Sequence, residues 1–184
     1  MRRPFNLIAI ALATFWLAAC SSNPSIESDM GIDGAPDWVN EGTQAVSDDD
    51  GRLIYGVGSA PVLNDVALQT AAADSRARAE VARVVSTFID STVSDYSASA
   101  GGDSKAALNI EQNIKATTQT ALNGAKIKGR WRDPETGTVY SFAEMDIKAL
   151  NEAIAAAGKL SDSFKQFYTQ KANANFDRFV KEAK

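Results

Sequence analysis

The stretch AKIKGRWRDPETGTVYSFAEMDI, residues 125–147, decides the fold. Two runs of alternating polar and apolar residues flank the sequence DPETG, residues 133–137, which is typical of a tight turn. The stretch therefore predicts an antiparallel β-hairpin. Odd-numbered side chains are expected to share the face toward the core: Ile127, Trp131, Val139, Ala143, Met145 and Ile147. Even-numbered side chains then share the other face, with Lys126, Lys128, Arg130 and Arg132 opposite Tyr140, Phe142, Glu144 and Asp146.

A third strand is expected at RLIYGVGSA, residues 52–60, because its side chains alternate between a larger and a smaller set. Its glycines, Gly56 and Gly58, match only part of a dinucleotide-binding motif, since Pro61 stands where a third glycine belongs. We interpret both glycines as positions where a helix approaches the strand closely.

A long helix is predicted to begin at Asn64 or Asp65 and to end near Ser94. Residues at three- and four-residue steps form its inward face: Val66, Thr70, Ala73, Ala77, Val81, Val84, Val85 and Phe88. Residues 104–122 predict a second helix, although threonines leave a strand at 108–122 as an open alternative. Further helices are expected at 148–157 and 159–184. This order predicts an α+β fold: a small, mostly antiparallel sheet with the long helix and the further helices packed on one face.

The N-terminus carries a second pattern. Residues 1–19 combine a positive start with an apolar run too short for a membrane span, which is typical of a secretory signal peptide. The sequence LAAC, residues 17–20, resembles the lipobox of bacterial lipoproteins; an ordinary signal peptide is the alternative. The resemblance implies cleavage before Cys20 and acylation of Cys20 with chains such as palmitate. Residues 20–36 then form the lipidated N-terminus and a flexible tether of about 20 Å.

Composition narrows the function classes. The chain has 184 residues, no histidine, one cysteine and a formal net charge of −4, so it is poorly suited to nucleic acid or to zinc, copper and iron chemistry. The aspartates of SDDDG, residues 47–51, do not have the spacing of a calcium loop. Glu144 and Asp146 are interpreted as salt-bridge partners rather than as a catalytic pair. We therefore predict a protein without catalytic activity, cofactor, metal or small-molecule substrate.

The order of the motifs resembles the LPP-twenty family of small bacterial outer-membrane lipoproteins, whose domain also occurs in FlgP-like flagellar lipoproteins. The quoted pieces are the lipobox, PDWV (36–39), YGVGSA (55–60), ALQTAAADSRARAEVARVVST (67–87) and KGRWRDPETGTVYSFAEMD (128–146). The resemblance covers residues 36–147 and predicts a family domain at 37–157. It implies a lipid-anchored, flagellum- or envelope-associated protein on the periplasmic face of the outer membrane.

Two surfaces are candidate sites for protein partners, including copies of the chain itself. The first is the basic hairpin face formed by Lys126, Lys128, Arg130 and Arg132; alternatively, Lys126 pairs with Glu144 and Arg130 lies on Tyr140. The second is the amphipathic aromatic helix at 158–184, with Phe164, Tyr168, Phe176 and Phe179; alternatively, this face covers the domain's own sheet. We expect a structural or assembly role. The alternative, activation of a cell-wall-synthesis enzyme, needs a longer tether.

Overall fold

The structure, a computed structural model, describes residues 31–44, 53–99 and 124–182, together with six residues between 110 and 122. Residues 32–184 belong to one compact unit, which contains every element named below. The predicted signal peptide, Cys20, the tether up to residue 30 and SDDDG at 47–51 lie outside the described residues.

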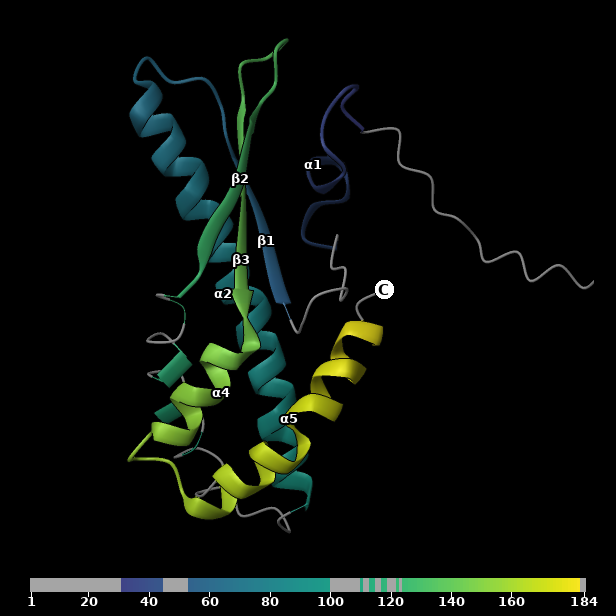
Figure 1. The fold of residues 1–184 in the computed structure, drawn as a ribbon, viewed down its shortest axis with the longest axis vertical. Coiled ribbons are helices and arrows are strands. Elements are labelled where there is room, and N and C mark those ends of the chain that lie inside the picture. The colour runs from purple at the N-terminus through teal and green to yellow at the C-terminus, as the bar shows by residue number, and fades with distance from the viewer. Residues whose placement is uncertain are drawn as a thin grey trace, which may run out of the picture. The chain divides into compact units, whose positions relative to one another are not determined.

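Three antiparallel strands form the sheet in the order β1-β3-β2 (Figure 1). They are β1 (Leu53–Ala60), β2 (Lys126–Arg132) and β3 (Val139–Asp146). The turn between β2 and β3 is closed by bonds from Asp133 N to Thr138 O and from Gly137 N to Asp133 O, both 2.9 Å. Gly137 has a φ of 69°, a conformation that favours glycine. The predicted hairpin and third strand are therefore confirmed.

A β-bulge shifts the side-chain alternation of β2. Ile127 pairs with Ala143 and Gly129 with Phe142, so Lys128 is an extra residue between them. Beyond the bulge, Trp131 pairs with Tyr140 instead of facing the core. The prediction that the odd-numbered residues of β2 share the core face is thus correct for Ile127 and wrong for Trp131.

Helix α2 (Val66–Ser99) covers one face of the sheet and continues past its end (Figure 1). The Asp65 carboxylate caps it by accepting hydrogen bonds from the backbone N–H groups of Ala67 and Leu68, at 2.8 and 3.0 Å. A Cβ added at Gly56 would lie 2.4 Å from Ala77 O, and one added at Gly58 would lie 2.2 Å from Ala77 N. The close approach predicted for these two glycines is confirmed.

The remaining helices are short at the N-terminus and longer at the C-terminus. The 3₁₀ helix η1 (Gly42–Gln44) follows α1 (Asp37–Glu41), and α4 (Ile147–Ala156) and α5 (Asp162–Glu182) follow the sheet. Beyond the sheet, α4 and α5 lie beside the second half of α2 (Figure 1). The six described residues between 110 and 122 are helical, so the strand considered for that segment is wrong at these positions.

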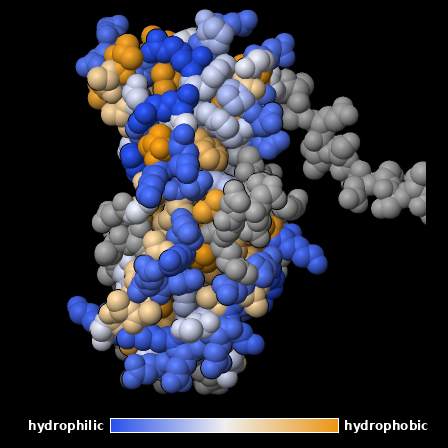
Figure 2. Space-filling model, in the orientation of Figure 1, coloured by the Kyte–Doolittle hydropathy of each residue, from blue (hydrophilic) through white to orange (hydrophobic). Residues whose placement is uncertain are grey.

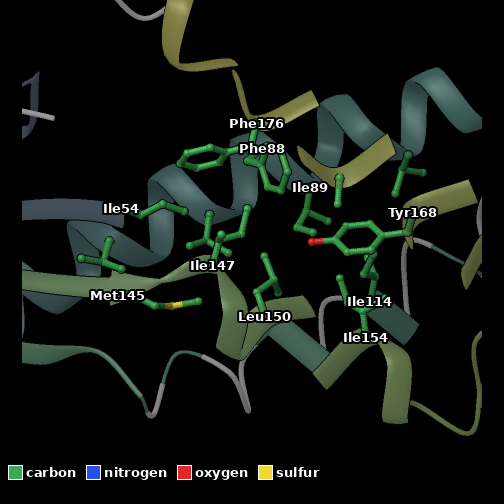
Figure 3. Packing of buried hydrophobic residues seen from close by; sticks show 14 of the residues in the cluster. Ile54, Phe88, Ile89, Ile114, Met145, Ile147, Leu150, Ile154, Tyr168 and Phe176 are labelled. Atoms are coloured by element: carbon green, nitrogen blue, oxygen red, sulfur yellow. The ribbon is translucent and has the colours of Figure 1, made fainter. Parts of the chain in front are cut away.

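One hydrophobic cluster runs from the sheet to the C-terminal helices (Figure 3). It joins Ile54 and Met145 of the sheet to Phe88 of α2 and to Phe164 and Phe176 of α5. Helix α5 shares this core, so the boundary predicted at residue 158 does not separate two cores. The α+β class is confirmed, with the difference that α5 packs on α2 and α4 rather than on the sheet.

Candidate interaction surfaces

The bulge distributes the four basic residues of β2 over two faces of the sheet. Lys126 pairs with Glu144 in the strand register, and Lys128 Nζ lies 3.3 Å from Glu144 Oε1. Arg130 and Arg132 instead pair with Ser141 and Val139, whose side chains face α2. The single basic face predicted for partner binding is therefore wrong.

Arg130 takes part in a polar cluster between the hairpin and α2. Its Nε and Nη2 donate to the two carboxylate oxygens of Asp74 at 2.8 and 2.6 Å. The hydroxyl of fully buried Ser141 donates to the same carboxylate at 2.7 Å. These bonds, above all those from Arg130, lower the pKa of Asp74, although burial acts in the opposite direction. The alternative in which Arg130 lies on Tyr140 is also wrong.

A second polar connection holds the tip of the hairpin. The Gln69 side chain is buried on α2, and its Nε2 donates to Ala60 O at 3.2 Å and to Gly137 O at 2.9 Å. Arg132 Nη2 donates to Gln69 Oε1 at 3.2 Å. One amide side chain therefore ties α2 to the end of β1 and to the hairpin turn, and the exposed Arg130 and Arg132 both connect β2 to α2.

The opposite face of the sheet carries aromatic residues, which we call the outer aromatic face: Trp38, Tyr55, Trp131, Tyr140 and Phe142. The Trp131 and Tyr140 rings lie 5.6 Å apart, and Phe142 lies 5.0 Å from Tyr55 and 5.5 Å from Trp38 (centroid distances). Trp38 comes from α1 and lies over Gly129. A Cβ added at Gly129 would be in ordinary van der Waals contact with the Trp38 ring. Four of the five residues are half-buried, and Tyr55 is buried.

One residue in the sequence could have indicated this face, although the regular alternation of polar and apolar residues did not. A glycine inside a strand often marks a bulge, and Gly129 directly follows the bulge at Lys128. Had the register been shifted at Gly129, Trp131 would have been placed beside Tyr140. On this face, Trp131 lies beside Tyr140, Phe142 lies in the neighbouring row, and Lys128 and Glu144 lie at the other end.

The aromatic face of α5 lies inside the unit. Phe164, Tyr168 and Phe176 are buried, and Phe179 is half-buried. Phe88 of α2 lies 5.8 Å from Phe176 and 5.7 Å from Phe179, and Tyr168 donates to Asn151 Oδ1 on α4 at 2.8 Å (Figure 3). Burial raises the pKa of Tyr168. The predicted partner surface on α5 is wrong for the three buried rings, which pack on α2 and α4 rather than on the sheet.

Exposed apolar side chains gather where sequence patterns did not place them. All the large hydrophobic side chains exposed among the described residues lie in one stretch: Val62 (60%), Leu63 (36%), Val66 (56%) and Leu68 (59%). Figure 2 shows hydrophobic atoms at the top of the view, over the loop before α2 and its first turn. Val66 was predicted to face the core, and that prediction is wrong. The helical period continues to Val66, but the sheet ends before it.

Glu144 and Asp146, the two carboxylates considered as a catalytic pair, both have partners in the fold. Glu144 pairs with Lys128, and Asp146 Oδ1 accepts a hydrogen bond from Lys148 N at 2.8 Å, which caps α4. Within the described part of the chain, no three histidine, cysteine or acidic residues gather in a way that could hold a metal ion. The predicted absence of catalysis stays a prediction.

No protein-family model matches the sequence, and no curated protein matches it. The resemblance to LPP-twenty lipoproteins stays a prediction that rests on the quoted motifs. None of the described helices combines the length and the apolar character needed to span a membrane.

Proposed function

We propose that the protein is a non-catalytic lipoprotein, anchored to the outer membrane through Cys20, with a structural or assembly role in the cell envelope. Its partners are proteins, and their contact surface is the outer aromatic face. The observation that carries this proposal is the asymmetry of the sheet. Helix α2 covers one face, whereas Trp38, Trp131, Tyr140 and Phe142 on the other face remain only half-buried.

The chemistry of the outer aromatic face suits protein binding. Tryptophan and tyrosine are enriched at the centres of protein interfaces because they bury a large apolar area and retain a polar group. Trp131 and Tyr140 are half-buried neighbours, so a partner can still cover their remaining surface. Lys128 and Glu144 provide a charged border at the other end of this face.

The membrane part of the proposal rests on the N-terminal sequence. A single acyl chain gives marginal membrane binding, whereas two or more hold a protein stably. Acylated Cys20 would therefore keep the unit at the membrane, and residues 21–31 would hold it within about 20 Å on average. A short tether suits contacts made close to that membrane.

Two measurements test the proposal. Mass spectrometry of the mature chain should show Cys20 as its first residue, with the added mass of two or three acyl chains. A photo-crosslinking amino acid at position 140 should give discrete protein adducts in intact cells, and Trp131→Ser should reduce them. Gln170, exposed on α5, is the matched control position.

Either measurement can contradict the proposal. A mature chain that begins elsewhere, or a free thiol at position 20, rules out the anchor. Equal adducts from positions 140 and 170 rule out the outer aromatic face as the contact surface.

A further inference from the structure

The exposed apolar side chains at the start of α2 form one continuous tip. Each residue from Pro61 to Leu68 is exposed, and six of the eight are proline, alanine, valine or leucine. Water contact of this much aliphatic surface in one short stretch is unfavourable, and contiguous exposed apolar patches mark binding sites. We call these residues, Pro61–Leu68, the aliphatic tip.

The aliphatic tip is held firmly. The Asp65 cap fixes the first turn of α2, and Gln69 ties the next residues to Ala60 O and Gly137 O. Val62 lies directly over the hairpin turn, because a Cβ added at Gly137 would lie 2.8 Å from Val62 Cγ2. The apolar side chains are therefore presented outward by a loop and a first helical turn that are bonded to the end of the sheet.

The composition of the tip distinguishes two kinds of occupant. Protein hot spots are rich in tryptophan, tyrosine and arginine, whereas leucine and valine are under-represented in them. The exposed large side chains of the tip are all valine or leucine, and it contains no aromatic or basic residue. Valine and leucine side chains carry no polar group that needs a partner, so the hydrocarbon of a lipid layer can cover them while Asn64 and Asp65 stay at its polar surface.

The position of the tip suits the same occupant. The chain joins the compact unit beside the sheet, where Asn40 of α1 bonds to the backbone of Ile32 and Trp38 packs on Phe142. Phe142 is three residues along β3 from Val139, so this junction lies about 10 Å along the strand from the hairpin end. A lipid on Cys20, joined through eleven residues that span about 20 Å on average, can therefore enter the bilayer that the tip reaches.

We propose that the aliphatic tip inserts into the interface of the lipid bilayer and serves as a second attachment point. The inference rests on the proposed function in one respect, since the lipid on Cys20 brings the tip to the bilayer. Helix α2 has 34 residues, and Phe164 at the start of α5 contacts Tyr96 near its far end, so insertion would hold the start of α5 on the order of 45 Å from the tip.

The test replaces the natural lipid by an artificial anchor. A chain that begins at Ser21 keeps the whole compact unit, contains no cysteine and contains no histidine. An N-terminal histidine tag then holds it on phosphatidylcholine vesicles that contain a nickel-chelating lipid. Leu63→Cys, labelled with a polarity-sensitive fluorophore, should show a blue shift on these vesicles. The same label at Gln170→Cys, exposed on α5, is the control and should show no shift.

Further substitutions in the labelled chain measure the contribution of the patch. Val62→Ser with Leu68→Ser should lower the ratio of inserted to free tip at least about tenfold, because two aliphatic side chains leave hydrocarbon. Gln166→Ser with Gln170→Ser, two exposed changes on α5, should leave the ratio unchanged. Circular dichroism should give the same helical signal for all variants, since all four positions are exposed.

Three outcomes would overturn the inference. They are an unshifted label at position 63 on the vesicles, equal shifts at positions 63 and 170, and a shift that depends on protein concentration without vesicles. The last outcome would identify a second copy of the chain as the occupant. Absence of lipid on Cys20 would appear in the mass of the mature protein and would not alter the vesicle result, so the two proposals fail separately.

Discussion

Helix α2 is packed in two different ways along its length. In the sheet region, formed by β1, β2, β3 and residues 66–84 of α2, the helix contacts glycines of β1 through alanine. In the helix region, formed by residues 85–99 of α2 with α4 and α5, it contacts aromatic rings, such as Phe88 against Phe176. The same helix is thus fixed by close backbone approach at one end and by large side chains at the other.

The difference shows how each region is specified. Close approach leaves little side-chain volume, so the sheet region depends on directional bonds, from Arg130 and Ser141 to Asp74 and from Gln69 to Ala60 and Gly137. The helix region depends on burying apolar volume, to which Phe164 contributes a fully buried ring. Substitutions that remove side-chain volume should therefore lower the stability most in the helix region. Substitutions that add volume or remove a hydrogen-bond partner should lower it most in the sheet region.

The largest effect is expected from Phe164→Ala. The substitution removes a fully buried ring that contacts Tyr96 and Tyr168, at centroid distances of 5.3 and 6.2 Å. Such a cavity typically costs about 3–5 kcal/mol, a large part of the stability of an ordinary domain. Urea unfolding followed by circular dichroism measures the loss. Gln166→Ala, an exposed change on the same helix, is the control, and equal effects of the two would contradict the assignment of Phe164 to the core.

Gly58→Ala tests the close approach in the sheet region. The added methyl group would lie 2.2 Å from the backbone nitrogen of Ala77, so α2 must move. We expect a loss of about 1–3 kcal/mol, seen as a lower urea midpoint. Gly158→Ala is the matched control because its Cβ would meet nothing within 4 Å. A neutral effect at position 58 would mean that α2 does not lie as close to β1 as described.

Asp74→Asn should cost about 1–3 kcal/mol at neutral pH, because the ion pair with Arg130 is lost and the amide nitrogen of asparagine cannot accept the second hydrogen bond from Arg130. The pKa of Asp74 is lowered in the folded state, so its contribution is complete above the unfolded pKa and is lost as the pH falls through the folded pKa. The urea midpoints of wild type and variant should therefore begin to converge as the pH falls below about 4, the unfolded pKa of an aspartate. A difference independent of pH would contradict this role.

The smallest effect is expected from Lys128→Met. The ion pair with Glu144 is half-exposed and should contribute less than about 1 kcal/mol. Arg130→Met, two residues along the same strand, removes both bonds to Asp74 and should lower the thermal midpoint more. Equal shifts at the two positions would show that the bulge does not separate their environments.

The sequence was sufficient to predict the hairpin and the long helix, but it did not predict which side of the sheet each side chain occupies. Alternation and turn chemistry predicted the hairpin at 125–147, and the glycines of β1 predicted the close approach of α2, because both signals are local. The faces of Arg130 and Trp131 depend on the bulge at Lys128, and one inserted residue reverses every later side chain in the strand.

Burial was harder to predict where it depends on the end of a neighbouring element. Val66 continues the apolar period of α2 but lies beyond the sheet, so it is exposed. Phe164 and Phe176 are aromatic residues of a kind that is common at protein interfaces. They are buried because α2 extends beyond the sheet and covers them. Amphipathic patterns identify an apolar face without identifying what covers it.

The strand order has a consequence for the time course of folding. Among the described strands, β1 pairs with β3 alone, and Ala60 lies opposite Val139 while Leu53 lies opposite Asp146, so the partners are 79 to 93 residues apart. The β2–β3 hairpin is local and can close within microseconds, whereas β1 must wait for a long loop to close. A chain that emerges N-terminus first therefore presents β1 before its partner β3, and α2, which follows β1 directly, can cover its apolar face in the meantime.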